Sequence, residues 1–205
     1  MDRIFLAGLL GGIAMFTWVY ISWTVLPVGS VGLRKLPDET AVLQALQKHI
    51  AENSGIYLFP ALRLQPDPNH KDLAEKIARG PSGILMYNAA GSRSLVISRW
   101  LLDFLTELAQ ALLAVFLLSQ TRLTTFGSRL AFVLLVGLLA AIATNVGYWN
   151  WYGFPWDYTL ASMFVQVVGF LWVGLVAAFL LKNRTFGVTS ARGFLPRIWR
   201  AILGD

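Results

Sequence analysis

One stretch decides the class of this chain, and it runs from Arg129 to Lys182: RLAFVLLVGLLAAIATNVGYWNWYGFPWDYTLASMFVQVVGFLWVGLVAAFLLK. Between those two ends the only charged residue is Asp157. On either side of that acid lie two apolar runs, Leu130–Tyr148 and Thr159–Leu181. Because the hydrocarbon core of a bilayer is about 30 Å thick and takes about 20 helical residues to cross, each run is long enough for one span.

Two further apolar runs precede this stretch. Ile4–Leu26 carries no charge, and Trp100–Leu118 is apolar apart from Asp103, Thr106, Glu107 and Gln110. Hydrophobic residues make up 56% of the chain and charged residues only 14%, whereas a soluble domain carries about 25% charged residues. The sequence therefore predicts an all-α membrane protein. We expect a four-helix transmembrane bundle with a small α/β extracytoplasmic domain inserted between the first and second spans.

The basic residues of the short connections predict the orientation. The connection between the second and third spans holds Arg122 and Arg129 and no acid, whereas the connection from Trp149 to Tyr158 holds no basic residue. Arg3 precedes the first span, and five Lys and Arg residues follow the fourth. We therefore expect a multi-pass protein of the bacterial inner membrane with both termini in the cytoplasm. The predicted parts are a first span (1–26), an extracytoplasmic domain (27–99), three further spans (100–181) and a cytoplasmic basic amphipathic tail (182–205).

The segment 27–99 is too patterned for a linker. Leu36-Pro37-Asp38-Glu39 starts a predicted helix, and short apolar runs at 56–59 and 84–87 predict two strands, with a second helix between them that Asn69 would cap. A two-stranded sheet is marginal alone. We therefore expect this domain to pack on the outer mouth of the helices or on a partner protein.

A polar face on the second span is the best candidate site. Asp103, Glu107 and Gln110 are spaced i, i+4, i+7 and so share one side of a helix. A carboxylate at the centre of a membrane costs about 2.5–3.5 kcal/mol even on insertion scales. The other polar residues at matching outer depth are Thr144, Asn145, Asn150, Asp157, Ser162 and Gln166. Either these groups line a pocket open to the outside, or they form a structural polar knot, and the second interpretation is favoured.

Two other patterns suit helices in a membrane. Gly8-x-x-x-Gly12, with Gly11 beside it, predicts a close helix contact, within the chain rather than between copies. An aromatic belt at the outer headgroups is predicted from Tyr148, Trp149, Trp151, Tyr152 and Trp156. A sugar-binding or quinone-binding platform is the alternative interpretation of these rings.

Signatures of several function classes are missing. The chain has no Cys and no Gly-x-Ser-x-Gly, His-Glu-x-x-His, phosphate loop or dinucleotide fingerprint. His49 and His70 have no diagnostic ligand spacing around them, so no metal site is predicted. The net charge of +6 is spread beside the spans, so no nucleic-acid partner is predicted. No cofactor is predicted either, although a bound lipid would fit an outer pocket.

In outline, four spans with cytoplasmic termini and a folded segment between the first two are similar to the claudin-type arrangement. The resemblance covers topology only, because claudin-type proteins carry a paired-Cys motif in that segment and this chain has no Cys. The sequences at Ile21–Pro27 and Tyr148–Pro155 look like those of a small bacterial membrane protein.

These patterns favour a non-enzymatic accessory or structural subunit that binds a larger membrane protein assembly. Its partners would be the lipid bilayer and other membrane protein subunits. The alternative is a small transporter or channel-like protein with Asp103 and Glu107 as an outward-facing acidic site. A lipid-acting membrane enzyme that uses the same carboxylates is the third hypothesis.

Overall fold

The computed structural model describes residues 3–50, 52–60, 70–91 and 96–182. Four of the helices in these ranges are long and apolar enough to cross a membrane. The predicted mostly helical chain with four membrane-length helices is thus confirmed. The helices are α1 (Arg3–Thr24), α4 (Val96–Ser119), α5 (Phe126–Tyr152) and α6 (Trp156–Leu180).

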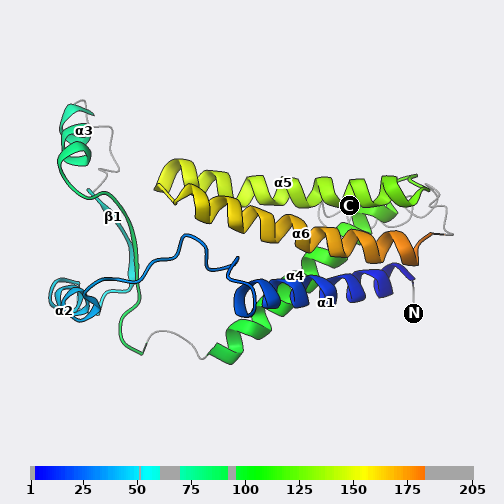
Figure 1. Ribbon diagram of the computed structural model, residues 1–205, viewed down its shortest axis with the longest axis horizontal. Helices are drawn as coiled ribbons and strands as arrows, with labels where there is room; N and C mark the ends of the chain where they lie inside the picture. The colour runs from blue at the N-terminus through cyan, green and yellow to red at the C-terminus, as the bar shows by residue number, and fades with distance from the viewer. Residues whose placement is uncertain (1–2, 51, 61–69, 92–95, 183–205) are drawn as a thin grey trace, which may run out of the picture.

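The four long helices do not pack equally on one another (Figure 1). α1 packs along both α4 and α6, and α5 packs along α6, whereas α4 touches α5 and α6 only slightly. The order across the assembly is therefore α4, α1, α6, α5. The buried apolar core lies between these helices, and its largest side chains are Met15, Val115, Leu118, Val133, Phe170, Val173 and Leu181.

The close contact of α1 with α4 uses the predicted glycines. A Cβ at Gly8 would lie 2.7 Å from Cδ2 of Leu112, and a Cβ at Gly12 would lie 2.9 Å from Cα of Leu108. Gly11 faces α6 instead, where a Cβ would lie 3.3 Å from Cγ1 of Val173. Small residues thus let the backbone of α1 approach two neighbours at once.

The connection between α5 and α6 is shorter than the expected 149–158. α5 continues to Tyr152, where Gly153 ends it with a left-handed φ of 67°, and α6 begins at Trp156. The belt residues therefore lie on the last turns of α5 and the first turn of α6. With 27 residues, α5 is about 40 Å long, so its end reaches past a hydrocarbon core of about 30 Å. Trp151 and Trp156, at 79% and 68% exposure, are available to the headgroup region.

The α/β region between α1 and α4 holds α2 (Glu39–His49), β1 (Gly55–Phe59), α3 (His70–Arg79) and β2 (Gly83–Tyr87). Asp38 caps α2 by accepting a hydrogen bond of 2.9 Å from the backbone N–H of Ala41. The strands pair antiparallel, with Gly55 opposite Tyr87 and Phe59 opposite Gly83. This region extends from one end of the long helices (Figure 1). The predicted cap Asn69 and the amphipathic tail after Lys182 lie outside the described residues.

Candidate functional site

A small cavity lies between α1, α4 and α6, towards the end of the helices that carries the α/β region. Its volume is about 190 Å³. Glu107 and Gln110 of α4 and Ser162 and Gln166 of α6 supply the polar lining. Met15, Val19 and Val165 form an apolar wall. The structure therefore brings four of the nine polar residues named from the sequence to one cavity, namely Glu107, Gln110, Ser162 and Gln166.

The segment after α1 borders this cavity. Its Gly29 lines the cavity beside Trp23, and the Gly29 N–H donates a hydrogen bond of 2.8 Å to the carbonyl of Ser22. A Cβ at Gly29 would lie 2.6 Å from Cδ2 of Trp23. Three residues further on, Gly32 has a φ of 81°, and a Cβ there would lie 2.5 Å from Cβ of Tyr158 on α6. We call residues 25–32 the roof, because they cross from the end of α1 to the start of α6.

Hydrogen bonds link the polar side chains in pairs. Nε2 of Gln110 donates to Oε2 of Glu107 over 3.3 Å. On the other side, Nδ2 of Asn145 lies 2.9 Å from the carbonyl of Ala141 and 3.3 Å from Oε1 of Gln166. Asn145 thus holds Gln166 from α5 without lining the cavity itself. Among the described residues that line the cavity, Glu107 is the only ionisable side chain, and it is half-buried.

The remaining residues of the predicted cluster, Thr144 and Asp157 among them, do not line the cavity. Asp103 and Asn150 are exposed and do not line the cavity. α4 runs obliquely to the other helices and touches α6 only slightly, so a face shared along α4 does not meet α6 along its whole length. Asp103 lies one turn from Glu107, which is far enough to move it from the cavity to the surface.

Sequence reasoning did not find the α1 and roof contributions to this cavity. Met15, Val19 and Trp23 recur every four residues along α1, so a shared helix face was visible. Nothing in the spacing of an apolar helix marks which face meets a polar cavity. The contact of Gly29 with Trp23 depends on the path of the roof, for which the sequence offered only Pro27 and two glycines.

The cavity chemistry fits a small polar ligand or one cation. One carboxylate, two amides and one hydroxyl line it, which are oxygen-rich groups able to accept and donate hydrogen bonds. Across the described residues, no three His, Asp or Glu side chains are grouped closely enough to hold a metal ion. His49 lies exposed at the end of α2, far along the chain from Glu107.

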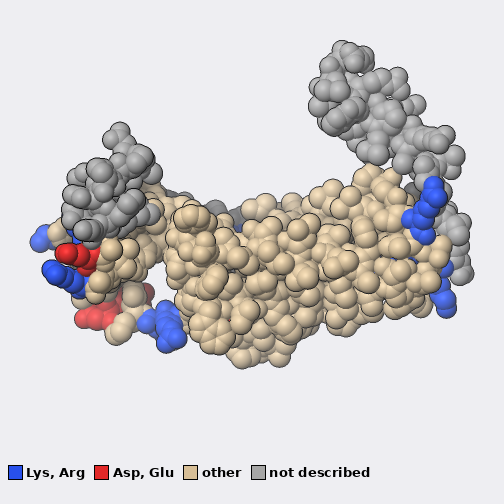
Figure 2. All heavy atoms as spheres, turned by 90° about the horizontal axis from the view of Figure 1, so that it is seen from above, with Lys and Arg blue, Asp and Glu red and all other residues tan. Residues whose placement is uncertain are grey.

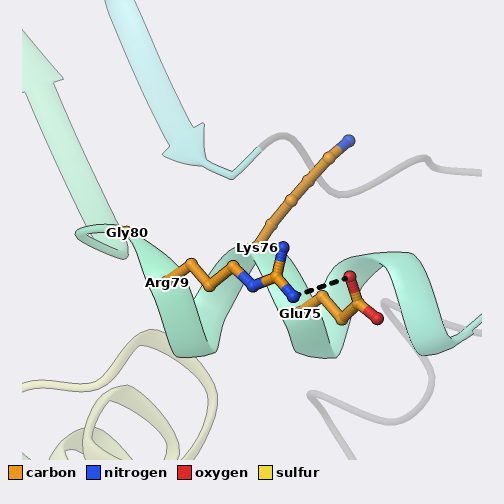
Figure 3. Close-up of a pocket in the computed structure, with 4 residues that line it drawn as sticks. All are labelled: Glu75, Lys76, Arg79 and Gly80. Carbon is orange, nitrogen blue, oxygen red and sulfur yellow. Dashed lines mark ion pairs between the residues drawn. The ribbon is translucent and has the colours of Figure 1, made fainter.

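A second hollow, on α3, is less suited to a function. It is lined by Glu75, Lys76, Arg79 and Gly80 and measures about 380 Å³. Figure 3 shows Arg79 directed along the helix towards Glu75, with Lys76 pointing away from the pair. The Arg79–Glu75 ion pair of 3.8 Å is exposed on both sides. Such a pair contributes about 0–1 kcal/mol, so this hollow is best described as a solvated helix surface.

Comparisons with known proteins found no relative of this chain. No family model, no curated protein and no solved structure matches the chain.

Proposed function

We propose that this protein is an accessory or structural subunit of a larger membrane protein assembly in the bacterial inner membrane. In this proposal the four long helices form the transmembrane bundle and both termini are cytoplasmic. The α/β region lies outside the membrane and binds the partner protein. The observation that carries the proposal is the absence of a core in that region.

Within its described residues, the segment from Val25 to Gly91 contains no buried residue. Large apolar side chains are exposed there instead. Ile56 is 68% exposed and Met86 is 62% exposed, and the two are opposite one another across the β1–β2 pair. The other exposed apolar side chains of this segment include Leu33, Leu36, Leu43, Phe59 and Ile77.

A region of this kind gains from a partner surface. An isolated two-stranded sheet is marginal in water, and full burial of one side chain such as Ile or Met contributes about 1.5–3 kcal/mol. Covering the Ile56–Met86 pair would therefore stabilise the sheet substantially. A hollow of about 270 Å³ lies where Phe59, Ile77 and Gly83 approach Trp151–Gly153 at the end of α5.

The charge distribution favours a protein partner over acyl chains for this surface. Figure 2 shows acidic and basic side chains together around the α/β region, while the middle of the long helical part is uncharged on the face shown. Side chains such as Glu75 and Arg79 are strongly exposed and require water nearby. Apolar residues interspersed among such charges are typical of a protein interface with a polar rim.

The test is extraction in a gentle detergent followed by size measurement and mass spectrometry. The wild-type protein should carry a stoichiometric partner. Ile56→Ser combined with Met86→Ser should release it, whereas Lys48→Ser, an exposed change on α2 of the same region, should retain it. A wild-type protein that runs alone, or only as copies of itself, would overturn the proposal.

A small transporter or channel-like protein is the second candidate, and the cavity favours it. Glu107 lies there among Gln110, Gln166 and Ser162, which is a plausible chemical setting for a proton or a monovalent cation. A carboxylate within a span is by default a functional hypothesis. Ion flux through purified protein in proteoliposomes, compared with Glu107→Gln, tests this candidate separately from complex formation.

A further inference from the structure

A groove at the opposite end of the helices carries an inference of its own. It lies between the start of α1 and the end of α6 and measures about 450 Å³. Two cationic side chains, Arg3 and Lys182, line it together with three apolar ones, Leu6, Phe179 and Leu180. This combination of charge and apolar surface is independent of the outer cavity and of the α/β region.

The packing of α1 on α6 explains why these residues meet. Each step along α1 is matched by an equal step back along α6. Gly11 faces Val173, Met15 faces Gly169, and Nε1 of Trp18 donates to the carbonyl of Val165 over 2.9 Å. Continued by two turns, the same antiparallel register places Arg3 level with the residues just after α6. The groove is therefore a fixed consequence of the helix contact.

The two charged side chains of the groove are both positive. Both Arg3 and Lys182 are exposed, and among the residues that the structure describes no acidic side chain belongs to the groove lining. In the view of Figure 2, the charged side chains at this end are blue only, whereas the red ones gather at the other end. The antiparallel dipoles of α1 and α6 offset one another here, so the positive potential comes from the two side chains.

The apolar part of the groove continues onto the surface of the span. Phe179 is 72% exposed and lies one turn before Lys182, at the end of an apolar helix of span length. Arg and Lys at such a position extend their charged heads to the interface while their stems cover apolar surface. A ligand that satisfies both parts needs an anionic head and a hydrocarbon chain.

We propose that this groove binds one anionic phospholipid of the adjacent leaflet. Its phosphate oxygens lie between Arg3 and Lys182, and its acyl chain runs along Leu6 and Phe179. A free phosphate would use the two cations and leave the apolar side chains uncovered. Each basic residue close to an anionic membrane surface strengthens binding about fivefold, so the pair accounts for a preference of about thirtyfold over a zwitterionic lipid.

The test uses the full-length purified protein in detergent, titrated with phosphatidylglycerol or phosphatidylcholine and followed by native mass spectrometry. The wild type should retain phosphatidylglycerol about thirtyfold more strongly. The double variant Arg3→Gln with Lys182→Gln should lose this preference. Arg122→Gln is the matched control, because it removes an exposed cation between α4 and α5 at the same end that does not line the groove.

Two further arms separate a lipid from a free anion. Phe179→Ala should weaken retention of phosphatidylglycerol and keep the preference for its charge, because only the chain contact is lost. Inorganic phosphate at millimolar concentration should not displace the lipid. Equal retention of both lipids by the wild type, equal effects of the double variant and Arg122→Gln, or displacement by inorganic phosphate would each overturn the proposal. Thermal unfolding without added lipid verifies that all variants are folded.

Discussion

Arg129, in the first turn of α5, donates a hydrogen bond from Nη1 to the backbone carbonyl of Leu181, the residue that follows α6. Its Nε donates a second one, of 2.9 Å, to the carbonyl of Leu123. The side chain is fully buried, with 0% exposure. One guanidinium therefore joins the α4–α5 connection, the start of α5 and the end of α6, and it satisfies a carbonyl that the helix end would leave unpaired.

Replacing Arg129 by Met should destabilise the protein by about 2–4 kcal/mol, because one buried and one partly buried carbonyl lose charge-assisted hydrogen bonds worth about 1.5–3 kcal/mol each and Met regains part of that by packing. Arg129→Lys should be intermediate, since one ammonium cannot reach both carbonyls in the same fork geometry. Thermal unfolding in detergent measures the effect. Arg122→Met, at an exposed position of the same connection, should leave the unfolding temperature unchanged, and an equal loss in both variants would contradict the proposed role.

The glycine contact of α1 predicts a second stability difference. In Gly12→Ala the new Cβ would lie 2.9 Å from Cα of Leu108, so α1 and α4 must separate, at a cost of about 1–3 kcal/mol. Gly147→Ala on α5 is the matched control, because a Cβ there meets nothing within 4 Å. It should be neutral or stabilising by up to about 1 kcal/mol through helix propensity. Unfolding temperatures that fall equally in both variants would mean that the close contact between α1 and α4 does not limit the size of the side chain at position 12.

The roof of the cavity can be tested through labelling. The chain has no Cys, so Ser162→Cys introduces a unique thiol in the cavity lining. Gly32→Ala should increase its labelling rate several-fold, because the left-handed φ and the contact with Tyr158 both oppose a side chain there. Gly91 has a similar φ of 77° with open space around it, so Gly91→Ala shares the strain and lacks the clash. Labelling that rises equally in both variants would mean that residues 25–32 do not close the cavity.

The basic residues of the short connections predict the orientation of the protein in the membrane, and reporter fusions test this orientation. A reporter fused after Asp205 should be active only as a cytoplasmic reporter, and one inserted at Asn69 only as an external one. An internal signal at Asn69 would place the α/β region in the cytoplasm and reverse the proposed arrangement.

The length of apolar runs and the spacing of apolar residues explain which parts of the fold were predictable from sequence. Four apolar runs of span length predicted α1, α4, α5 and α6 because the bilayer imposes a single length scale. The structure also places short helices and strands at the capped and apolar segments of 27–99. Boundaries shifted where a helix continued through aromatic residues, as α5 does to Tyr152, because Tyr and Trp suit a helix end as well as a connection.

The contacts between side chains of different helices were not predictable from the sequence in the same way. From the sequence, Arg129 served only as a topology determinant, and its burial depends on where α6 ends relative to α5. Spacing along α4 placed Asp103 and Glu107 on one face, but the oblique course of α4 decides which of them reaches the cavity. Such contacts depend on helix rotation and crossing, which a single amphipathic pattern leaves open. The Glu107–Gln110 pair was visible from sequence because both residues lie on one helix.

The two carboxylates of α4 provide the prediction that separates the candidate functions. Glu107→Gln keeps the shape of the side chain and an oxygen that can accept the hydrogen bond from Gln110, so its stability should change by less than about 1 kcal/mol. Asp103→Asn, at an exposed position, should change it by less than about 0.5 kcal/mol. For an accessory subunit, both variants should therefore retain the partner and unfold at the wild-type temperature.

For a proton or cation pathway through the cavity, Glu107→Gln should abolish ion flux in proteoliposomes. Asp103→Asn should keep most of the flux, because of these two carboxylates only Glu107 lines the cavity. Wild-type protein without flux, with both variants assembling normally, would leave Glu107 as a packing and hydrogen-bonding residue and exclude the transport candidate.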